Sequence, residues 1–105
     1  MRNRRPTQPG EILRDFFLES RRITVSAFAQ AVGCSRQHMS DIVNSQARIE
    51  PRMAARIGKV LGTSAQLWLN LQSAVDAWDA EREIATWQPS RTYLPPEDAS
   101  VTNGR

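Results

Sequence analysis

Apolar residues recur at the spacing of amphipathic helices from residue 9 to about residue 83. The first apolar face is formed by Ile12, Leu13, Phe16 and Phe17. This helix opens at Pro9-Gly10-Glu11, where a proline loses no hydrogen bond and a carboxylate suits the positive end of the helix dipole. We expect it to end near residues 20–22.

Two short helices follow, separated by a glycine turn. Thr24 and Ser35 are suitable N-cap residues, and Gly33 stands where a helix C-terminus favours a residue that tolerates positive φ. The apolar positions of the pair are Phe28, Ala29, Val32, Met39, Ile42 and Val43. A polar loop is expected over residues 44–50.

Pro51 begins a fourth amphipathic segment that Gly62 ends, and Thr63 or Ser64 can cap a fifth helix. The fifth helix carries apolar side chains on more than one face, so one small core cannot bury all of them. The candidate residues of a dimer interface are Trp68, Leu69 and Trp78. The two tryptophans equally suit a core.

The pattern therefore predicts an all-α chain with five helices in one domain, as a length of 105 residues allows. Residues 1–6 are expected to be a flexible basic arm and residues 7–85 the helix-turn-helix domain. Residues 86–105 are expected to be an irregular or disordered tail, because prolines and a polar C-terminus replace the helical pattern.

Charge is distributed unevenly along the chain. Residues 1–60 hold eleven Lys or Arg against five Asp or Glu, a net of +6, and residues 61–105 hold three against six, a net of −3. A basic half suits a polyanion such as DNA, although such a charge run equally suits plain solvation. No apolar run is long enough for a membrane span or a secretory signal, so a cytoplasmic protein is expected.

The helix pair at residues 24–44 is typical of a helix-turn-helix, whose second helix enters the major groove by its N-terminal residues. Arg36 can bond to guanine and Gln37 to adenine. The short donors suited to phosphate oxygens are Thr24, Ser26, Ser35 and Asn44. An ordinary helical hairpin with no DNA-binding role has the same spacing.

Other polar residues permit several interpretations. His38, the single histidine, suits a groove contact or plain exposure and has no partner cluster for catalysis. Cys34 suits packing at the turn better than a redox switch. The acidic residues of the fifth helix suit a solvated face or a surface for a basic partner better than a metal or acid–base site. No cofactor, metal or enzymatic site is expected.

The sequence resembles the HigA family of antitoxins, a branch of the Xre/Cro-type helix-turn-helix repressors. The resemblance covers about residues 6–80. It is carried by the opening at residues 9–13, the segment from Ala31 to Asn44, and above all by Leu61-Gly-Thr-Ser-Ala-Gln-Leu-Trp-Leu-Asn-Leu-Gln72, with Leu67 where the family usually has an aromatic residue.

The resemblance implies a lambda-repressor-like domain of five helices that dimerises. It further implies binding to palindromic operator DNA, with autorepression of the operon, and neutralisation of a small basic RelE-like toxin (HigB-like) that cleaves mRNA. Carried onto this chain, the groove-facing residues are Ser35, Arg36, Gln37, His38, Ser40 and Asp41, with Thr24 and Ser26 on the DNA backbone. A solitary Xre-type repressor without a toxin is the alternative.

Two departures from the family pattern concern the DNA-binding region. The loop after the recognition helix reads Asn44-Ser-Gln-Ala-Arg48, where relatives often have Asn-Gly followed by basic residues. Arg48 is then expected to be the main phosphate contact of the loop. Asp41 is acidic at a groove-facing position, where it either accepts from a cytosine amino group or pairs with a neighbouring arginine.

Overall fold

The computed structural model describes residues 4–96, so residues 1–3 of the expected arm and residues 97–105 of the expected tail lie outside the described part. The helices are α1 (Pro9–Ile12), which continues into the π-helical segment η1 (Leu13–Glu19), α2 (Val25–Val32), α3 (Arg36–Val43), α4 (Pro51–Leu61) and α5 (Ala65–Glu83). With α1 and η1 counted as one continuous helix, the predicted all-α fold of five helices is confirmed, and residues 4–96 contain no strand.

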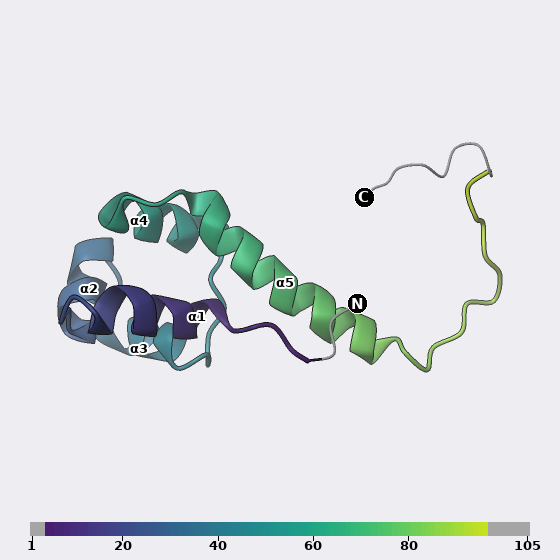
Figure 1. Ribbon diagram of the computed structural model, residues 1–105, viewed down its shortest axis with the longest axis horizontal. Coiled ribbons are helices and arrows are strands. Elements are labelled where there is room, and N and C mark those ends of the chain that lie inside the picture. Colours follow the sequence, from purple (N-terminus) through teal and green to yellow (C-terminus); the bar gives the residue numbers. More distant parts are fainter. Residues whose placement is uncertain (1–3, 97–105) are drawn as a thin grey trace.

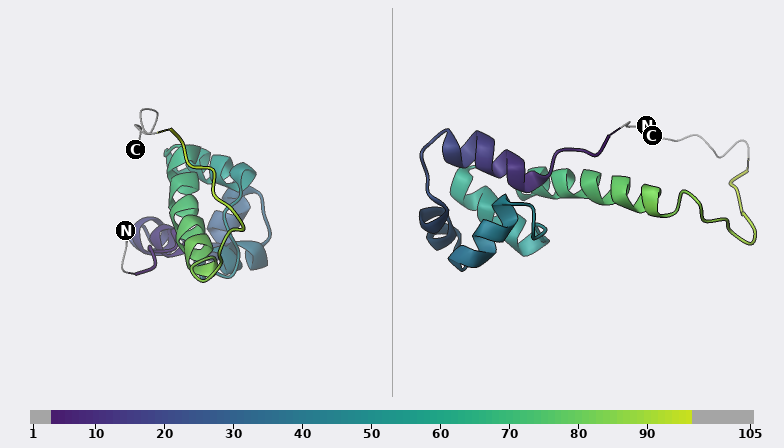
Figure 2. Two further views of the ribbon diagram at one scale, coloured as in Figure 1. Left: turned by 90° about the vertical axis from the view of Figure 1, so that its right-hand side faces the viewer. Right: turned by 90° about the horizontal axis from the view of Figure 1, so that it is seen from below.

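The first four helices form a rounded body, and α5 leaves it as a long projecting arm (Figures 1 and 2). The N-terminal half of α5 packs against α4 and the first helix, while its C-terminal half extends beyond the body. Residues 84–96 are exposed and contain no helix. No helix in the described range is both long enough and apolar enough to cross a bilayer.

The face of the first helix differs from the predicted one. Phe16 is 70 % exposed, whereas Leu18 is only 2 % exposed and belongs to the core together with Leu13. In a π-helix the backbone bonds run from residue i to i+5, so residues five apart lie closer to the same face than they do in an α-helix. The prediction that Phe16 faces the core, which assumed α-helical periodicity, is therefore wrong.

Side-chain caps fix the helix starts as predicted. The hydroxyl oxygen of Thr24 accepts from the N–H of Ala27 (3.0 Å), and that of Ser35 accepts from the N–H of His38 (3.0 Å). The cap of α5 is Ser64, which accepts from the N–H of Leu67 (3.1 Å). Gly33 ends α2 at φ 79°, in the left-handed region that the turn requires.

Trp68 is the largest side chain of the core and is fully buried. Its indole N–H donates to the hydroxyl of Thr63 (2.8 Å), and its ring meets the edge of Phe17 at 5.3 Å between centroids. Of the two placements that the sequence left open for Trp68, the structure therefore supports the core and not the dimer interface. Leu69 and Trp78 are only partly buried.

Gly10 sets how closely the first helix approaches the recognition helix. A Cβ atom at this position would lie 1.8 Å from the carbonyl oxygen of Ile42 and 2.9 Å from its carbonyl carbon. Only a residue without a side chain allows this backbone contact, so Gly10 helps to hold the C-terminal end of α3 in place.

We predict that Gly10→Ala destabilises the fold by about 2 kcal/mol or more, because the collision is with backbone that cannot turn away. Urea denaturation followed by circular dichroism measures the change. Gln30→Ala, on the exposed side of α2, is the control and should stay within about 0.5 kcal/mol of the parent chain. A Gly10→Ala variant as stable as this control would show that the first helix can pack differently.

Candidate nucleic-acid interface

The short helices α2 and α3 pack on each other and are joined across Gly33, and Ala29 of α2 is only 2 % exposed. One side of α3 is anchored in the core by Met39, Ile42 and Val43. The opposite side of α3 therefore faces solvent, as a helix that enters a DNA groove must.

Arg36 lies on the flank of α3 that faces α2. Its Nε–H donates to the hydroxyl oxygen of Ser26 at 2.9 Å. This bond links Arg36 to Ser26, another predicted contact residue. It holds the aliphatic part of the arginine side chain between α3 and α2. The Nη groups lie beyond the bonded Nε as further donors.

Gln37 and Asp41 lie one turn apart on the exposed side of α3. The amide nitrogen of Gln37 donates to the Asp41 carboxylate at 2.9 Å. Within the chain, Asp41 is therefore bonded to its neighbour on the same helix rather than to an arginine. The amide nitrogen has a second N–H, so this bond leaves one donor and the carbonyl oxygen of Gln37 for adenine.

The residues predicted to touch phosphate begin or end the two helices. Thr24 and Ser35 use their hydroxyl oxygens as acceptors in the caps, so the O–H groups remain as donors. At the other end of α3, the Asn44 amide donates to the hydroxyl of Ser40 at 3.3 Å. Two further predicted contact residues are thus bonded to each other.

His38 lies on the flank of α3 away from α2, beside an open hollow of about 510 Å³. The hollow is bordered by the N-terminal segment, the loop after α3 and the middle of α5. His38 therefore sits at the edge between the exposed side of α3 and this hollow.

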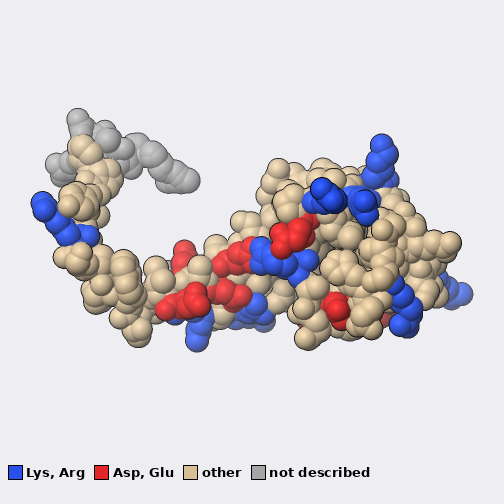
Figure 3. Space-filling model, turned by 180° about the vertical axis from the view of Figure 1, so that it is seen from behind, with Lys and Arg blue, Asp and Glu red and all other residues tan. Residues whose placement is uncertain are grey.

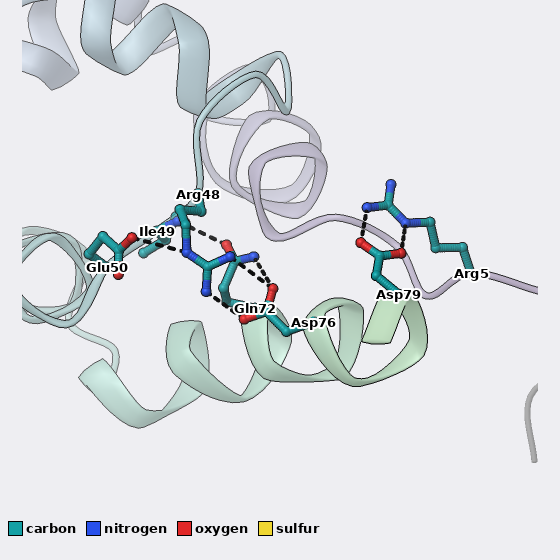
Figure 4. Close-up of polar contacts among 7 residues, drawn as sticks. All are labelled: Arg5, Arg48, Ile49, Glu50, Gln72, Asp76 and Asp79. Atoms are coloured by element: carbon teal, nitrogen blue, oxygen red, sulfur yellow. Dashed lines mark hydrogen bonds and ion pairs between the residues drawn. The ribbon is translucent and has the colours of Figure 1, made fainter. Parts of the chain in front are cut away.

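Arg48 does not extend freely from the loop. Its guanidinium binds the Asp76 carboxylate through two hydrogen bonds of 3.0 and 2.5 Å, and its Nε pairs with Glu50 at 3.0 Å (Figure 4). The phosphate contact expected of Arg48 stays a prediction, and in the structure two carboxylates hold its charge.

Gln72 fastens the same loop to α5 from inside. Its side chain is the buried polar group of the described core, 6 % exposed. The carbonyl oxygen accepts from the backbone N–H of Ile49 at 2.8 Å, and the amide donates to Asp76 at 3.1 Å. A buried N–H without an acceptor would be costly, so this bond fixes the path of the loop.

A second arginine reaches α5 from the N-terminal segment. Arg5 binds Asp79 through its Nε and Nη2, at 2.8 and 2.7 Å (Figure 4). The sequence reasoning did not find Arg5, Gln72, Asp76 and Asp79 as a set. The spacing i, i+4, i+7 from Gln72 places three of them on one helix face and was the available signal.

Charge separates along the molecule as the sequence suggested. Acidic side chains gather on the projecting half of α5, where some cationic side chains lie beside them, and further cationic side chains are spread over the body and its junction with α5 (Figure 3). The acidic residues of this half are Asp76, Asp79, Glu81 and Glu83. No group of three or more His, Cys, Asp or Glu residues suited to a metal occurs among residues 4–96.

The loop has Ser45 where the family often has the glycine of Asn-Gly, and this replacement strains the backbone. Ser45 has a φ of 61°, in the region that glycine adopts without strain, and its hydroxyl is buried without a hydrogen-bond partner. The loop therefore keeps a glycine-like conformation with a less suitable residue.

Comparison with known proteins places this geometry in a family. The chain is 43% identical over 81 residues to an uncharacterized HTH-type transcriptional regulator of Haemophilus influenzae, covering 77% of this chain and 76% of the relative. It is 41% identical over 76 residues to antitoxin HigA-1 of Vibrio cholerae, covering 72% and 71%. The chain belongs to the HigA family of helix-turn-helix regulators and antitoxins.

Solved structures of the HigA family have the same fold as this chain. Pseudomonas aeruginosa antitoxin HigA, determined with the higBA promoter, superposes with a TM-score of 0.75 at 43% identity, covering 78% of this chain and 89% of that protein. No family model matches the chain. The resemblance noted in the sequence is thereby confirmed for this HigA-family chain.

We predict that the Asp76 clamp makes stability depend on pH. The hydrogen bond from Arg48, and then that from Gln72, lowers the pKa of Asp76 below its usual 3.8. A lowered folded-state pKa means that the stabilisation is present above pH 3.8 and is lost as the pH falls through the folded-state value. Because both side chains are 40–51 % exposed, the effect at pH 7 is about 1 kcal/mol or less.

Urea denaturation of the parent chain and Asp76→Asn from neutral pH down to about pH 3 tests this point. The difference between them should shrink at the acid end. Glu83→Gln, which alters the same helix in its exposed part, should differ from the parent by an amount that changes less with pH. A constant gap for Asp76→Asn would mean that its carboxylate contributes through something other than its charge.

Proposed function

We propose that this protein is the antitoxin of a type II toxin–antitoxin system that also represses its own operon. In this proposal a homodimer in the cytosol binds palindromic operator DNA through α3 and neutralises a RelE-like, mRNA-cleaving toxin. The observation that carries the DNA-binding part is the solvent-facing side of α3, held by the core on one side and by the Ser26–Arg36 bond across α2.

The DNA-binding part draws on three further features. The two helix N-termini at Thr24 and Ser35 direct backbone N–H groups outward, where phosphates can accept from them. Arg36, Gln37, His38 and Asn44 are all exposed. The related Pseudomonas aeruginosa HigA was determined with its promoter.

Features of α5 support the parts of the proposal that concern the toxin and the dimer. Its projecting half carries several acidic side chains, which suit a basic partner (Figure 3). Leu69 and Trp78 remain partly exposed in one chain, and a second protomer would cover them. The relative from Vibrio cholerae carries the name antitoxin.

A solitary repressor is the second candidate. It is favoured by the Haemophilus influenzae relative, which is named a transcriptional regulator. Both candidates use the same DNA-binding surface, so they differ only in the presence of a toxin.

We predict that Arg36→Ala weakens binding to the chain's own upstream DNA by about 1–3 kcal/mol and relaxes preference at one base position. Fluorescence anisotropy with a set of single-base variants of that DNA measures both effects. Arg91→Ala removes the same charge from the exposed segment after α5 and should leave base preference unchanged. Unaltered affinity and preference in Arg36→Ala would refute the placement of the recognition helix.

The toxin is tested by producing the tagged chain together with the untagged product of the neighbouring gene. We expect a small basic protein to co-purify through high salt in fixed stoichiometry and to arrest growth when produced alone. Light scattering of the tagged chain should give the mass of a dimer. DNA binding without any co-purifying partner would favour the solitary repressor.

A further inference from the structure

Two arginines far apart in the sequence end on the same face of α5. Arg5 binds Asp79 and Arg48 binds Asp76, one helical turn away (Figure 4). All four residues border the hollow of about 510 Å³ that also reaches His38 on the recognition helix. The N-terminal segment and the recognition loop are thus fastened to α5 by two parallel ion pairs.

The hollow lies along one flank of the recognition helix. Met39, Ile42 and Val43 anchor α3, Arg36 borders the flank next to α2, and His38 borders the opposite flank. A helix in the major groove has a phosphate backbone on either side. Thr24 and Ser26 serve the α2 side, and the cations that border the other side are Arg5 and Arg48.

We propose that the flank of α3 beside the hollow, with Arg5 and Arg48, is a phosphate-binding surface. Without DNA, Asp76 and Asp79 bind the two arginines in place of phosphate oxygens. On binding, Arg5 and Arg48 exchange these carboxylates for oxygens of the phosphodiester backbone. The carboxylates therefore set an upper limit to DNA affinity. This inference rests on the DNA-binding part of the proposed function.

The exchange is physically accessible because both ion pairs are open to water. Arg5 and Asp79 are 44 % and 46 % exposed, and Arg48 and Asp76 are 51 % and 40 % exposed. Exposed ion pairs contribute little to stability, so they can open at low cost. A phosphate offers an arginine the same two-oxygen geometry as a carboxylate.

Opening the pairs leaves the loop in place. The bond from the Ile49 N–H to Gln72 holds the loop independently of Arg48, and Gln72 itself is buried. The side chain of Arg48 can therefore turn toward DNA while its backbone stays fixed. Glu50, the second partner of Arg48, competes with phosphate in the same way.

The test compares full-length Asp76→Asn and Asp79→Asn with the parent chain. The probes are a labelled duplex from the chain's own upstream region and a scrambled duplex of equal length. Affinity is measured from about 50 to 200 mM salt, where each phosphate contact contributes about 0.9 to the slope of log K against log salt. We expect both variants to bind both duplexes more tightly than the parent at each salt concentration and with about the parent's slope, because the parent makes the same phosphate contacts once its ion pairs have opened.

Glu81→Gln is the matched control, because it removes one negative charge from the same helix and Glu81 forms none of the ion pairs found in residues 4–96. Its affinity for the two duplexes should change less than those of the two test variants. Adding Arg48→Ala to Asp76→Asn should abolish the gain, and adding it to Asp79→Asn should not. Circular dichroism confirms that each variant is folded, and Asp79→Asn alters only the exposed pair with Arg5.

Three results would overturn the inference. Binding of Asp76→Asn and Asp79→Asn equal to that of Glu81→Gln would mean that the gain is only a general charge effect. Weaker binding would mean that the carboxylates position the arginines for DNA. If the parent chain binds neither duplex, the DNA-binding proposal fails as well, whereas a binding parent with unresponsive variants refutes this inference alone.

Discussion

The loop between α3 and α4 depends on one buried hydrogen bond, from the backbone N–H of Ile49 to the side chain of Gln72. Ile49 is 1 % exposed, so its N–H has no water to bind and needs an acceptor within the protein. Gln72 supplies that acceptor from α5 and directs its own amide to Asp76. The end of the recognition helix, the loop and the long helix are thereby held in one arrangement.

A second constraint acts from the opposite side, where the first helix meets the backbone of Ile42 at Gly10. Between these two contacts α3 has little freedom to shift, and its solvent-facing side keeps a fixed direction. DNA recognition benefits from such rigidity, because contacts to base edges require positions accurate to a fraction of an ångström. The exposed ion pairs of Arg5 and Arg48 add little rigidity, since water weakens them, but they neutralise the charges of the two arginines.

Sequence reasoning succeeded where the determinants were local. The caps at Thr24 and Ser35 and the turn at Gly33 depend on residues within a few positions of each other, and all three were identified. It failed at Phe16, because a π-helical segment changes the periodicity that the pattern assumed. It also left Trp68 open between the core and a dimer interface, and only the structure placed it in the core, whereas Leu69 stays partly exposed.

By itself the sequence determined the helices, their caps, the glycine turn and the family, because each follows from neighbouring residues or from a continuous motif. Only the tertiary structure decided the partners of the charged side chains. Arg48 meets Asp76 across 28 positions and Arg5 meets Asp79 across 74, and no local rule relates residues so distant. The packing of α5 against the body brings them together, and it thereby decides which carboxylates hold these two arginines.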